Sequence, residues 1–236
     1  MEKINISNIE ILIPTLNEEG NIQETIKALQ SRNFKNITII DDNSSDNTIQ
    51  ISKDLGCNVI ENIDKKRLGF GLSLIKAIQS SKFEYCCIFD GDNSFDPDSL
   101  LEMIKKLDEG NDFVFCSRYK HNNVSPDDTY VSKFGNFFFT KTINILFNIM
   151  SSDVLFLYVM GKKENFRSLK LESKDFRICI EILLKSYLNF KCDEILSLER
   201  KRKFGESKVN TINDGIKILL DIIKYYFKKF FNKKLI

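Results

Sequence analysis

The sequence has a single histidine, His121, no tryptophan and only three prolines among 236 residues. One histidine excludes a histidine-rich zinc site. The six cysteines, at positions 57, 86, 87, 116, 179 and 192, lack the spacing of metal ligands, and several lie within apolar runs. They are typical of reduced core thiols in a cytosolic protein.

A long hydrophobic segment and a dominant charge are also absent. Met1 is followed by Glu2 and Lys3 rather than by an apolar stretch, so we expect no signal peptide. The segment nearest to a membrane span, 143–160, carries Asp153 and two asparagines, so we expect no transmembrane helix. With 35 basic and 33 acidic residues the net charge is +2, which argues against a general nucleic-acid-binding protein.

Hydrophobic residues make up 42% of the chain, enough for a sizeable core in one large domain. Up to about residue 118, short apolar runs alternate with helical spacing. The expected strands are 9–13, 37–40, 57–60, 85–89 and 113–116, and the expected helices are 21–32, 46–55, 71–80 and 97–107. This order predicts an α/β fold with a doubly wound, mostly parallel sheet flanked by helices.

The second half changes character. Residues 119–132 are polar, and the next segment is rich in aromatic residues, with Phe134, Phe138, Ile145 and Ile149 roughly along one face. We expect a strand at 154–160, a helix at 176–187, a strand at 195–198, a basic loop at 199–208 and a terminal helix from about 212. No linker is long enough to divide the chain into independent domains.

Asp90-Gly91-Asp92 is the most informative motif. It follows the apolar run 85–89 and precedes an Asn/Ser/Pro-rich turn. The carboxyl end of a buried strand is where open α/β sheets place their ligands. Two carboxylates there are suited to a hard divalent cation that bridges a diphosphate. The alternative is an ordinary polar turn.

Carboxylates follow two other expected strands. Asp41 and Asp42 end the strand 37–40, and Glu18 lies in the loop after the first strand. Each is compatible with a contact to a ribose or base, or with a turn that caps the next helix. Because the carboxyl ends of parallel strands meet in one crevice, the three sites together favour a ligand.

Basic residues lie near the same expected edge. Lys65, Lys66 and Arg67 precede Gly69-Phe70-Gly71, which is an incomplete dinucleotide fingerprint, and they fit either a diphosphate contact or a solvated loop. Arg118 ends the strand 113–116. The densest basic cluster surrounds 205–207 and is either a solvated loop or one that closes over an anion; its members are Arg200, Lys201, Arg202, Lys203 and Lys208.

The terminal helix is amphipathic and rich in lysine. One face carries an apolar stripe, formed by Ile216, Leu219, Leu220, Ile223, Phe227 and Phe230. A basic, aromatic helix of this kind fits an anionic membrane surface. It fits equally a helix that packs on its own domain or on a second subunit.

Taken in order, these segments resemble the family-2 glycosyltransferases with a GT-A fold, and most of all the polyprenyl-phosphate sugar synthases, the dolichol-phosphate mannose synthase group. The resemblance covers nearly the whole chain. It rests on 13–18, 41–48, 90–94, 117–119, Phe176 with Glu181, Arg202 with 205–208, and Thr211 with 214–215.

The resemblance implies a role for each matching residue. Asp90 and Asp92 would hold Mg²⁺ or Mn²⁺ at the donor diphosphate, with Ser94 as a further ligand. Pro14, Glu18 and Asp42 would hold the nucleoside and its ribose. Arg118, Arg202 and Lys208 would meet phosphates, and the substrate-binding set is completed by Thr15, Asp41, Lys66, Gly71 and Lys133.

The implied reaction is an inverting, metal-dependent transfer of a hexose from a GDP- or UDP-sugar to a polyprenyl phosphate at the cytoplasmic membrane face. Residues 1–118 would form the nucleotide-binding half, 119–210 the acceptor half, and 211–236 a contact with a membrane surface or a partner subunit. Two alternatives stay open. One is a glycosyltransferase for a soluble or cell-envelope glycan, and the other is a catalytically silent sugar-nucleotide binder or partner subunit.

One segment departs from the family pattern. After Ser152-Asp153, where relatives commonly continue with small residues and an arginine, this chain has Phe156, Leu157 and Tyr158. Lys133 also stands near a position where relatives often carry arginine. The departure concerns recognition of the acceptor or the sugar.

Overall fold

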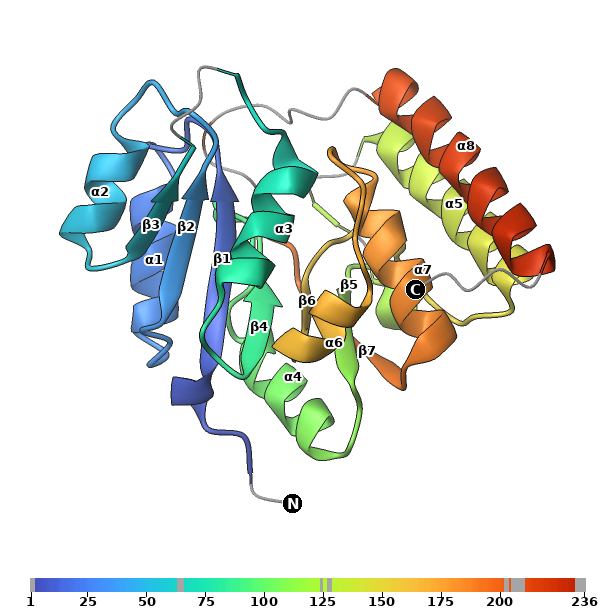
Figure 1. Cartoon of the computed structure of the whole chain (residues 1–236), viewed down its shortest axis with the longest axis horizontal. Helices are drawn as coiled ribbons and strands as arrows, with labels where there is room; N and C mark the ends of the chain where they lie inside the picture. The colour runs from blue at the N-terminus through green and yellow to red at the C-terminus, as the bar shows by residue number, and fades with distance from the viewer. Residues whose placement is uncertain are drawn as a thin grey trace.

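A single mixed sheet organises the chain. The computed structural model describes residues 3–62, 66–123, 125–126, 129–201, 204 and 211–231. The sheet has seven strands in the order β3-β2-β1-β4-β6-β5-β7 (Figure 1). The strands are β1 (Ile9–Thr15), β2 (Ile37–Asp41), β3 (Asn58–Glu61), β4 (Tyr85–Ile88), β5 (Phe113–Ser117), β6 (Val159–Lys162) and β7 (Cys192–Leu196).

The described residues form eight α-helices, of which the last, α8, follows the final strand. They are α1 (Ile22–Gln30), α2 (Thr48–Asp54), α3 (Phe70–Ser80), α4 (Ser99–Asp108), α5 (Tyr130–Phe147), α6 (Lys163–Ser168), α7 (Ile178–Asn189) and α8 (Thr211–Phe230), with short 3-10 helices η1 (Ile6–Asn8) and η2 (Lys120–Asn122). Strand β1 pairs in parallel with β2 and β4, whereas β6 runs antiparallel to β4 and β5. The expected α/β fold with a mostly parallel sheet is confirmed.

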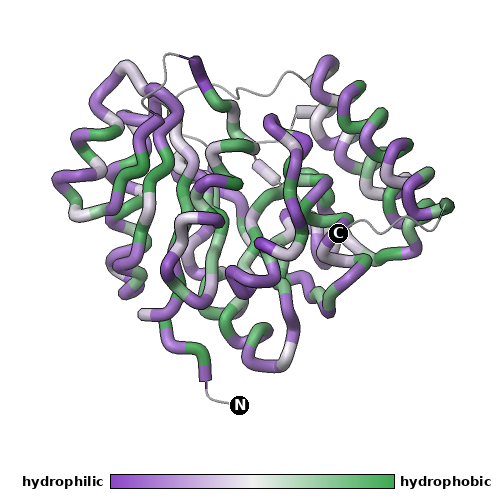
Figure 2. Tube along the Cα trace, viewed as in Figure 1, coloured by the Kyte–Doolittle hydropathy of each residue, from purple (hydrophilic) through white to green (hydrophobic). Residues whose placement is uncertain are grey.

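Side-chain alternation divides the core into two layers. In β4, Cys86 and Ile88 face α3, α6 and α7, and Tyr85 and Cys87 face α1 and α4. Hydrophobic residues concentrate along these central strands in Figure 2. Both faces of the sheet are thus covered, which explains why the strands read as nearly continuous apolar runs.

Two features differ from the expectation. The segment 154–158 is largely buried but irregular, with a bend at 154–155, and the strand that follows is β6. A short apolar run is typical of a buried strand, but also of any other buried segment. The apolar side chains of 154–158 therefore led to the prediction of a strand. Helix α6 was not expected.

Among the described residues, no helix combines the length and hydrophobicity that crossing a membrane requires.

The two halves of the chain meet where α3 begins. The amide of Gly71 donates to the carbonyl of Lys174 at 3.0 Å, and a Cβ added at Gly71 would lie 2.2 Å from the carbonyl oxygen of Ser173. Only glycine permits this approach. The 172–174 segment is held in turn by Glu181 of α7, whose carboxylate accepts from the amides of Glu172 and Ser173.

Glu181 also pairs with Lys185 at 2.8 Å, and both side chains are at least 95% buried. Burial alone would raise the pKa of Glu181, but the hydrogen bonds from Lys185 and Ser173 outweigh it and hold the pKa below its usual value. A carboxylate with a depressed pKa stabilises the fold above its unfolded-state pKa, and that contribution is lost as the pH falls through the folded-state pKa.

We therefore expect Glu181→Gln to lower the free energy of unfolding at neutral pH by about 3 kcal/mol, because Lys185 loses its buried partner. The difference from the wild type should narrow as the pH falls through the depressed pKa of Glu181, where this carboxylate itself becomes protonated in the folded state. Urea unfolding at several pH values measures both effects. Glu164→Gln, at a 70% exposed carboxylate, is the control and should change stability by under about 1 kcal/mol. A gap that stays constant with pH would contradict this account.

Candidate functional site

The carboxyl ends of β1, β2 and β4 lie at one edge of the sheet, as expected from their parallel pairing. Thr15 is in register with Asp41, and the amide of Asp42 donates to the carbonyl of Thr15 at 3.1 Å. On the other side of β1, the amide of Phe89 donates to Leu12 at 3.0 Å. The loops that follow these strands are therefore neighbours.

The Asp90-Gly91-Asp92 loop packs tightly against β1 and α1. The hydroxyl of Thr25 donates to the carbonyl of Gly91 at 3.2 Å, and a Cβ at Gly91 would lie 3.3 Å from the methyl of Thr15. Asp92 is 2% exposed and accepts from the amide of Ser94 at 2.9 Å, whereas Asp90 is half-buried. The loop is thus a compact turn that gathers two carboxylates and the buried Ser94.

Asp41 and Asp42 are both buried and accept several hydrogen bonds. Asp41 accepts from the Ser44 amide at 2.8 Å and from the Thr15 hydroxyl at 3.3 Å. Asp42 accepts from the Asn62 side chain at 2.8 Å and from two backbone amides of the loop before α3, those of Leu68 at 2.7 Å and Gly69 at 2.9 Å. Asp42 therefore fixes the loop that leads to Gly71, a contact that the sequence did not reveal.

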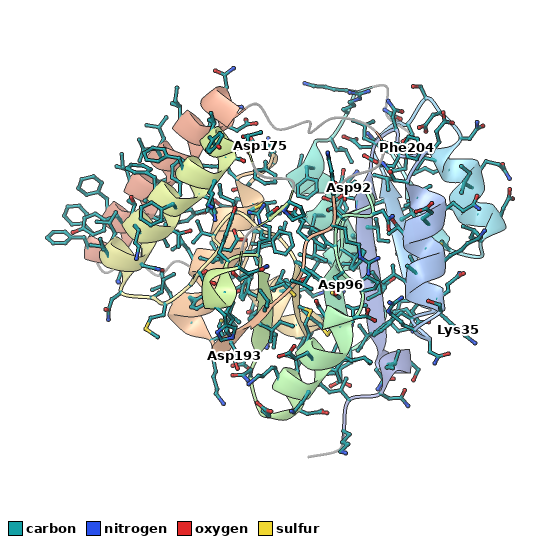
Figure 3. The ribbon with its side chains drawn as sticks, turned by 180° about the vertical axis from the view of Figure 1, so that it is seen from behind. Lys35, Asp92, Asp96, Asp175, Asp193 and Phe204 are labelled. Atoms are coloured by element: carbon teal, nitrogen blue, oxygen red, sulfur yellow. The ribbon has the colours of Figure 1, made fainter. Side chains whose placement is uncertain are left out.

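Glu18 lies beside a residue from the distant basic segment. Its carboxylate accepts from the Asn21 amide group at 3.1 Å, and the same group donates to the carbonyl of Phe204 at 3.1 Å. The Phe204 ring lies against Gly20, where an added Cβ would be 3.0 Å away. In Figure 3, Asp92 and Phe204 lie toward the same end of the molecule.

Arg118 is held in an ion pair. It donates to Asp153 through Nε at 2.7 Å and Nη2 at 3.0 Å, and the Asp153 side chain is fully buried. Its guanidinium carbon lies 4.8 Å from the centre of the Phe156 ring, and Glu199 is 3.6 Å away. Burial alone would lower the pKa of Arg118, but Asp153 raises it above its ordinary value, so Arg118 stays charged.

Phe156, at the departure from the family pattern, belongs to an aromatic cluster below the Asp90-Asp92 loop. The rings of Phe95 and Phe156 are 4.6 Å apart, and Phe95 stacks on Tyr158 at 4.7 Å. The Tyr158 hydroxyl donates to the carbonyl of Asp96 at 3.1 Å. The large residues at this segment thus support the loop from below and cover one side of Arg118.

The remaining predicted residues have varied positions. Pro14 is buried within β1, Lys66 and Lys133 are exposed, and Gly71 forms the junction with Lys174. Arg202 and Lys208, like Lys65, lie outside the described residues, so their roles stay predictions. The same holds for the substrate and metal contacts of the other residues named.

Sequence reasoning missed three supporting carboxylates: Asp153, Glu194 and Glu199. Glu194 of β7 accepts from the amide of Ser152 at 3.0 Å and the hydroxyl of Ser151 at 3.0 Å, which fixes the turn that carries Asp153. Asp153 follows two serines, Glu194 follows Asp193 and Glu199 precedes Arg200, so no common local pattern marked these carboxylates. Only the fold shows that they converge.

The start of the basic segment, near residue 199, is bonded to the loop that follows β4. The amide of Arg200 donates to the carbonyl of Ser94 at 2.8 Å, and its side chain pairs with Asp96 at 2.8 Å. Arg200 is therefore adjacent to the Asp90-Asp92 loop.

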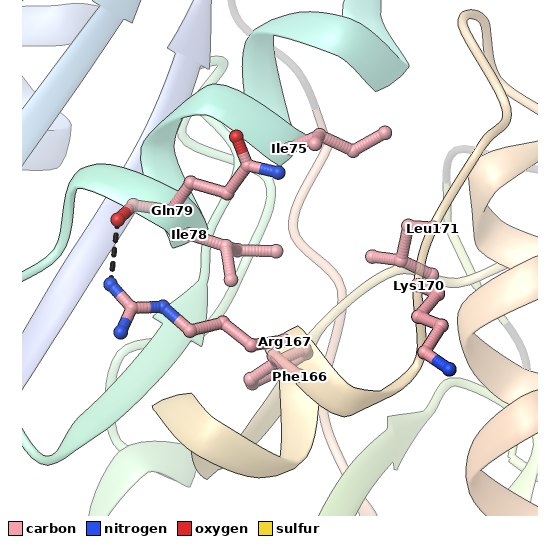
Figure 4. A pocket seen from close by; sticks show the side chains of 7 residues that line it. All are labelled: Ile75, Ile78, Gln79, Phe166, Arg167, Lys170 and Leu171. Carbon is pink, nitrogen blue, oxygen red and sulfur yellow. Dashed lines mark hydrogen bonds between the residues drawn. The ribbon is translucent and has the colours of Figure 1, made fainter. Parts of the chain in front are cut away.

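A separate pocket of about 60 Å³ lies between α3 and α6, lined by Ile75, Ile78 and Phe166 among others (Figure 4). Arg167 borders it and donates to the carbonyl of Gln79 at 2.6 Å. The volume is far below that of a typical ligand pocket. It is formed by helices on one face of the sheet rather than by the loops at the strand ends, so it does not belong to the candidate site.

Comparison with known proteins agrees with this geometry. The glycosyl transferase family 2 profile matches residues 10–171. The chain is 30% identical over 231 residues to the uncharacterized protein MJ1222 of Methanocaldococcus jannaschii, covering 94% of each chain. It is 26% identical to the UDP-N-acetylglucosamine–dolichyl-phosphate N-acetylglucosaminyltransferase of Methanococcus voltae, covering 86% of this chain and 85% of that protein.

A further relative is the dolichol-phosphate mannosyltransferase of Pyrococcus furiosus, 24% identical over 92% of this chain and 64% of that protein. Among solved structures, glucosyl-3-phosphoglycerate synthase from Mycobacterium tuberculosis, in complex with Mn²⁺, UDP-glucose and phosphoglyceric acid, superposes with a TM-score of 0.71 at 14% identity, covering 92% of this chain and 79% of that one. The fold is thus of the GT-A type, and the match over 10–171 shows that the chain is a transferase that belongs to glycosyl transferase family 2.

Proposed function

We propose that the protein transfers a hexose from a nucleotide-diphosphate sugar to a polyprenyl phosphate, with inversion and with a divalent metal. The observation that carries the proposal is the position of Asp90 and Asp92 at the same edge of the sheet as the carboxylates that end β2, with only β1 between the two strands. The names of the relatives from M. voltae and P. furiosus, which act on dolichyl phosphate, support this acceptor class.

Residues 1–118 form the donor half in this proposal. Pro14, Glu18 and Asp42 hold the nucleoside and ribose in this proposal, and Asp42 also positions the 66–69 loop through its three hydrogen bonds. Among the described residues, no group of three His, Cys, Asp or Glu side chains forms a complete metal site. Asp90 and Asp92 are the residues that would hold the ion, with oxygens of the donor diphosphate as further ligands, since hard cations prefer oxygen.

The donor set fits Mg²⁺ or Mn²⁺, since carboxylate and hydroxyl oxygens are their usual ligands. The metal, when bound, neutralises charge that builds on the leaving diphosphate. An acceptor phosphate is already anionic at neutral pH, so no histidine base is required. Its oxygen forms a bond to the anomeric carbon as the bond to the nucleotide diphosphate breaks. The bonding pair leaves with the diphosphate, and the configuration inverts.

Residues 119–210 form the acceptor half. Arg200 lies beside the Asp90-Asp92 loop, and the Arg118–Asp153 pair forms a rigid wall of the same edge. Two N–H groups of Arg118 already donate to Asp153. Only the remaining N–H groups of Arg118 are therefore available to a phosphate. Arg202 and Lys208 complete the proposed phosphate contacts.

We expect Asp92→Asn to lower transfer from GDP- or UDP-hexose to a polyprenyl phosphate by roughly 10³-fold, because a lost metal carboxylate removes several kcal/mol of transition-state stabilisation. Asp98→Asn is the matched control. Asp98 lies six residues away in sequence with its side chain 64% exposed, and its replacement should leave turnover within about twofold. Labelled sugar in the lipid phase measures both. Unchanged turnover in Asp92→Asn would refute the metal assignment.

The same assay separates the alternatives. Transfer to a soluble glycan but to no polyprenyl phosphate would favour a glycan-acting enzyme. Calorimetry that shows nucleotide-sugar binding, with no turnover on any acceptor, would favour a silent binder or partner subunit.

We further expect Asp153→Asn to lower the free energy of unfolding by about 3 kcal/mol, because it leaves the guanidinium of Arg118 buried beside a neutral partner. Urea denaturation measures the change. Glu199→Gln is the comparison, because Glu199 lies 3.6 Å from Arg118, beyond hydrogen-bond distance, and its replacement should cost clearly less than that of Asp153. Equal losses in the two variants would mean that Asp153 is not the principal partner.

A further inference from the structure

Helix α8 has two apolar faces. The inner face packs on the core through Ile218, Ile222 and Tyr225, which are at most 4% exposed. The predicted apolar stripe lies on the opposite face. Its residues are between 36% and 69% exposed; they are Ile216, Leu219, Leu220, Ile223, Phe227 and Phe230. The stripe therefore does not pack on its own domain, which was one of the alternatives for this helix.

Helix α5 repeats this arrangement. Ile143 and Phe147 are at most 1% exposed, whereas the other side of the helix presents large side chains between 45% and 95% exposed. These are Tyr130, Val131, Phe134, Phe137, Phe138 and Ile145. We call the exposed stripes of α5 and α8 together the helix-pair surface.

The helix-pair surface gathers nearly all the exposed hydrophobic bulk of the described chain. Apart from Leu101, Leu198 and Phe204, every large exposed hydrophobic residue lies in α5 or α8 or within three residues of their ends. The two helices lie side by side in Figure 1, and rings extend outward from them in Figure 3. Apolar side chains concentrated in this way mark an interaction surface.

The inner contacts prevent either helix from turning its outer stripe inward. Arg177 at the start of α7 pairs with Asp221 of α8 at 3.3 Å, and Lys229 donates to the carbonyl of Phe147 in α5 at 2.8 Å. Because these bonds and the buried inner faces fix the rotation of both helices, the surface needs an external partner.

Charge indicates which partner. Helix α5 contains two lysines and no acidic residue. In α8 the two acidic residues are already paired, Asp214 with Lys217 and Asp221 with Arg177. The exposed lysines of the two helices are Lys133, Lys141, Lys217, Lys224 and Lys229. A second copy would bring lysines of the same surface together, whereas an anionic lipid surface complements both the lysines and the aromatic rings.

We infer that the helix-pair surface docks the protein on a bilayer that contains anionic lipid, with α5 and α8 lying in the membrane interface. Both helices begin on the side toward which the arrows of β1 and β2 point in Figure 1, where the candidate site lies. The inference deepens the proposed function and rests on it for one point, that the acceptor phosphate is carried by a lipid.

The test is flotation of the full chain with two kinds of vesicle, phosphatidylcholine alone and phosphatidylcholine with phosphatidylglycerol. We expect binding to the anionic vesicles, weakened by salt. Two double variants remove aromatic and aliphatic anchors, Phe134→Asp with Phe137→Asp on α5 and Ile223→Asp with Phe227→Asp on α8. Each should weaken binding by about tenfold or more, since each removes apolar insertion and adds negative charge.

Leu101→Asp is the matched control, because Leu101 is a 54% exposed leucine on α4 and should leave binding unchanged. Circular dichroism and urea unfolding establish that each variant folds. Wild type that fails to float with anionic vesicles, or α5 variants that bind as wild type does, would overturn the inference. So would a wild-type dimer in light scattering that these variants dissociate while no form floats, because the occupant would then be a second copy.

Hydrolysis of the sugar nucleotide without vesicles reports the donor site alone. Its loss in Asp92→Asn, with flotation retained, tests the proposed function separately. If the α5 variant no longer floats with the vesicles but still hydrolyses the sugar nucleotide, the helix-pair surface has been disrupted while the donor site is intact.

Discussion

A buried carboxylate must find hydrogen-bond donors, and in this chain that requirement holds the loops of the site in place. Asp42 takes the amides of Leu68 and Gly69, and Glu181 takes those of Glu172 and Ser173. The two segments so fixed meet where Gly71 donates to Lys174. Two acidic side chains and one glycine thus hold the loop before α3 against the segment 172–174.

The acceptor side depends on the same principle. Glu194 fixes the turn at Ser151 and Ser152, the turn places Asp153, and Asp153 holds Arg118. Phe156 then covers the guanidinium and packs on Phe95 below the Asp90-Asp92 loop. The residues that depart from the family pattern thus contribute packing around Arg118.

The helix-pair surface follows from a different constraint. A helix with one apolar face buries that face by packing on its own domain. Helices α5 and α8 each have two apolar faces, and only one of the two is buried in this way. The inner faces close the core around Ile143 and Ile222, which leaves the outer faces to an external apolar phase. Arg177 links this surface to the start of α7, near the junction of the two halves.

The sequence alone determined the alternation of strands and helices, the position of Asp90-Gly91-Asp92 at a strand end and its convergence with Asp41 and Asp42. These follow from local periodicity and from the geometry of parallel strands, which hold before any packing is known. Tertiary structure decided that 154–158 is irregular rather than a strand and that Arg118 pairs with Asp153. It also decided which apolar face of α8 is covered. Periodicity shows that a face is apolar, but only the packed neighbours decide whether that face is buried.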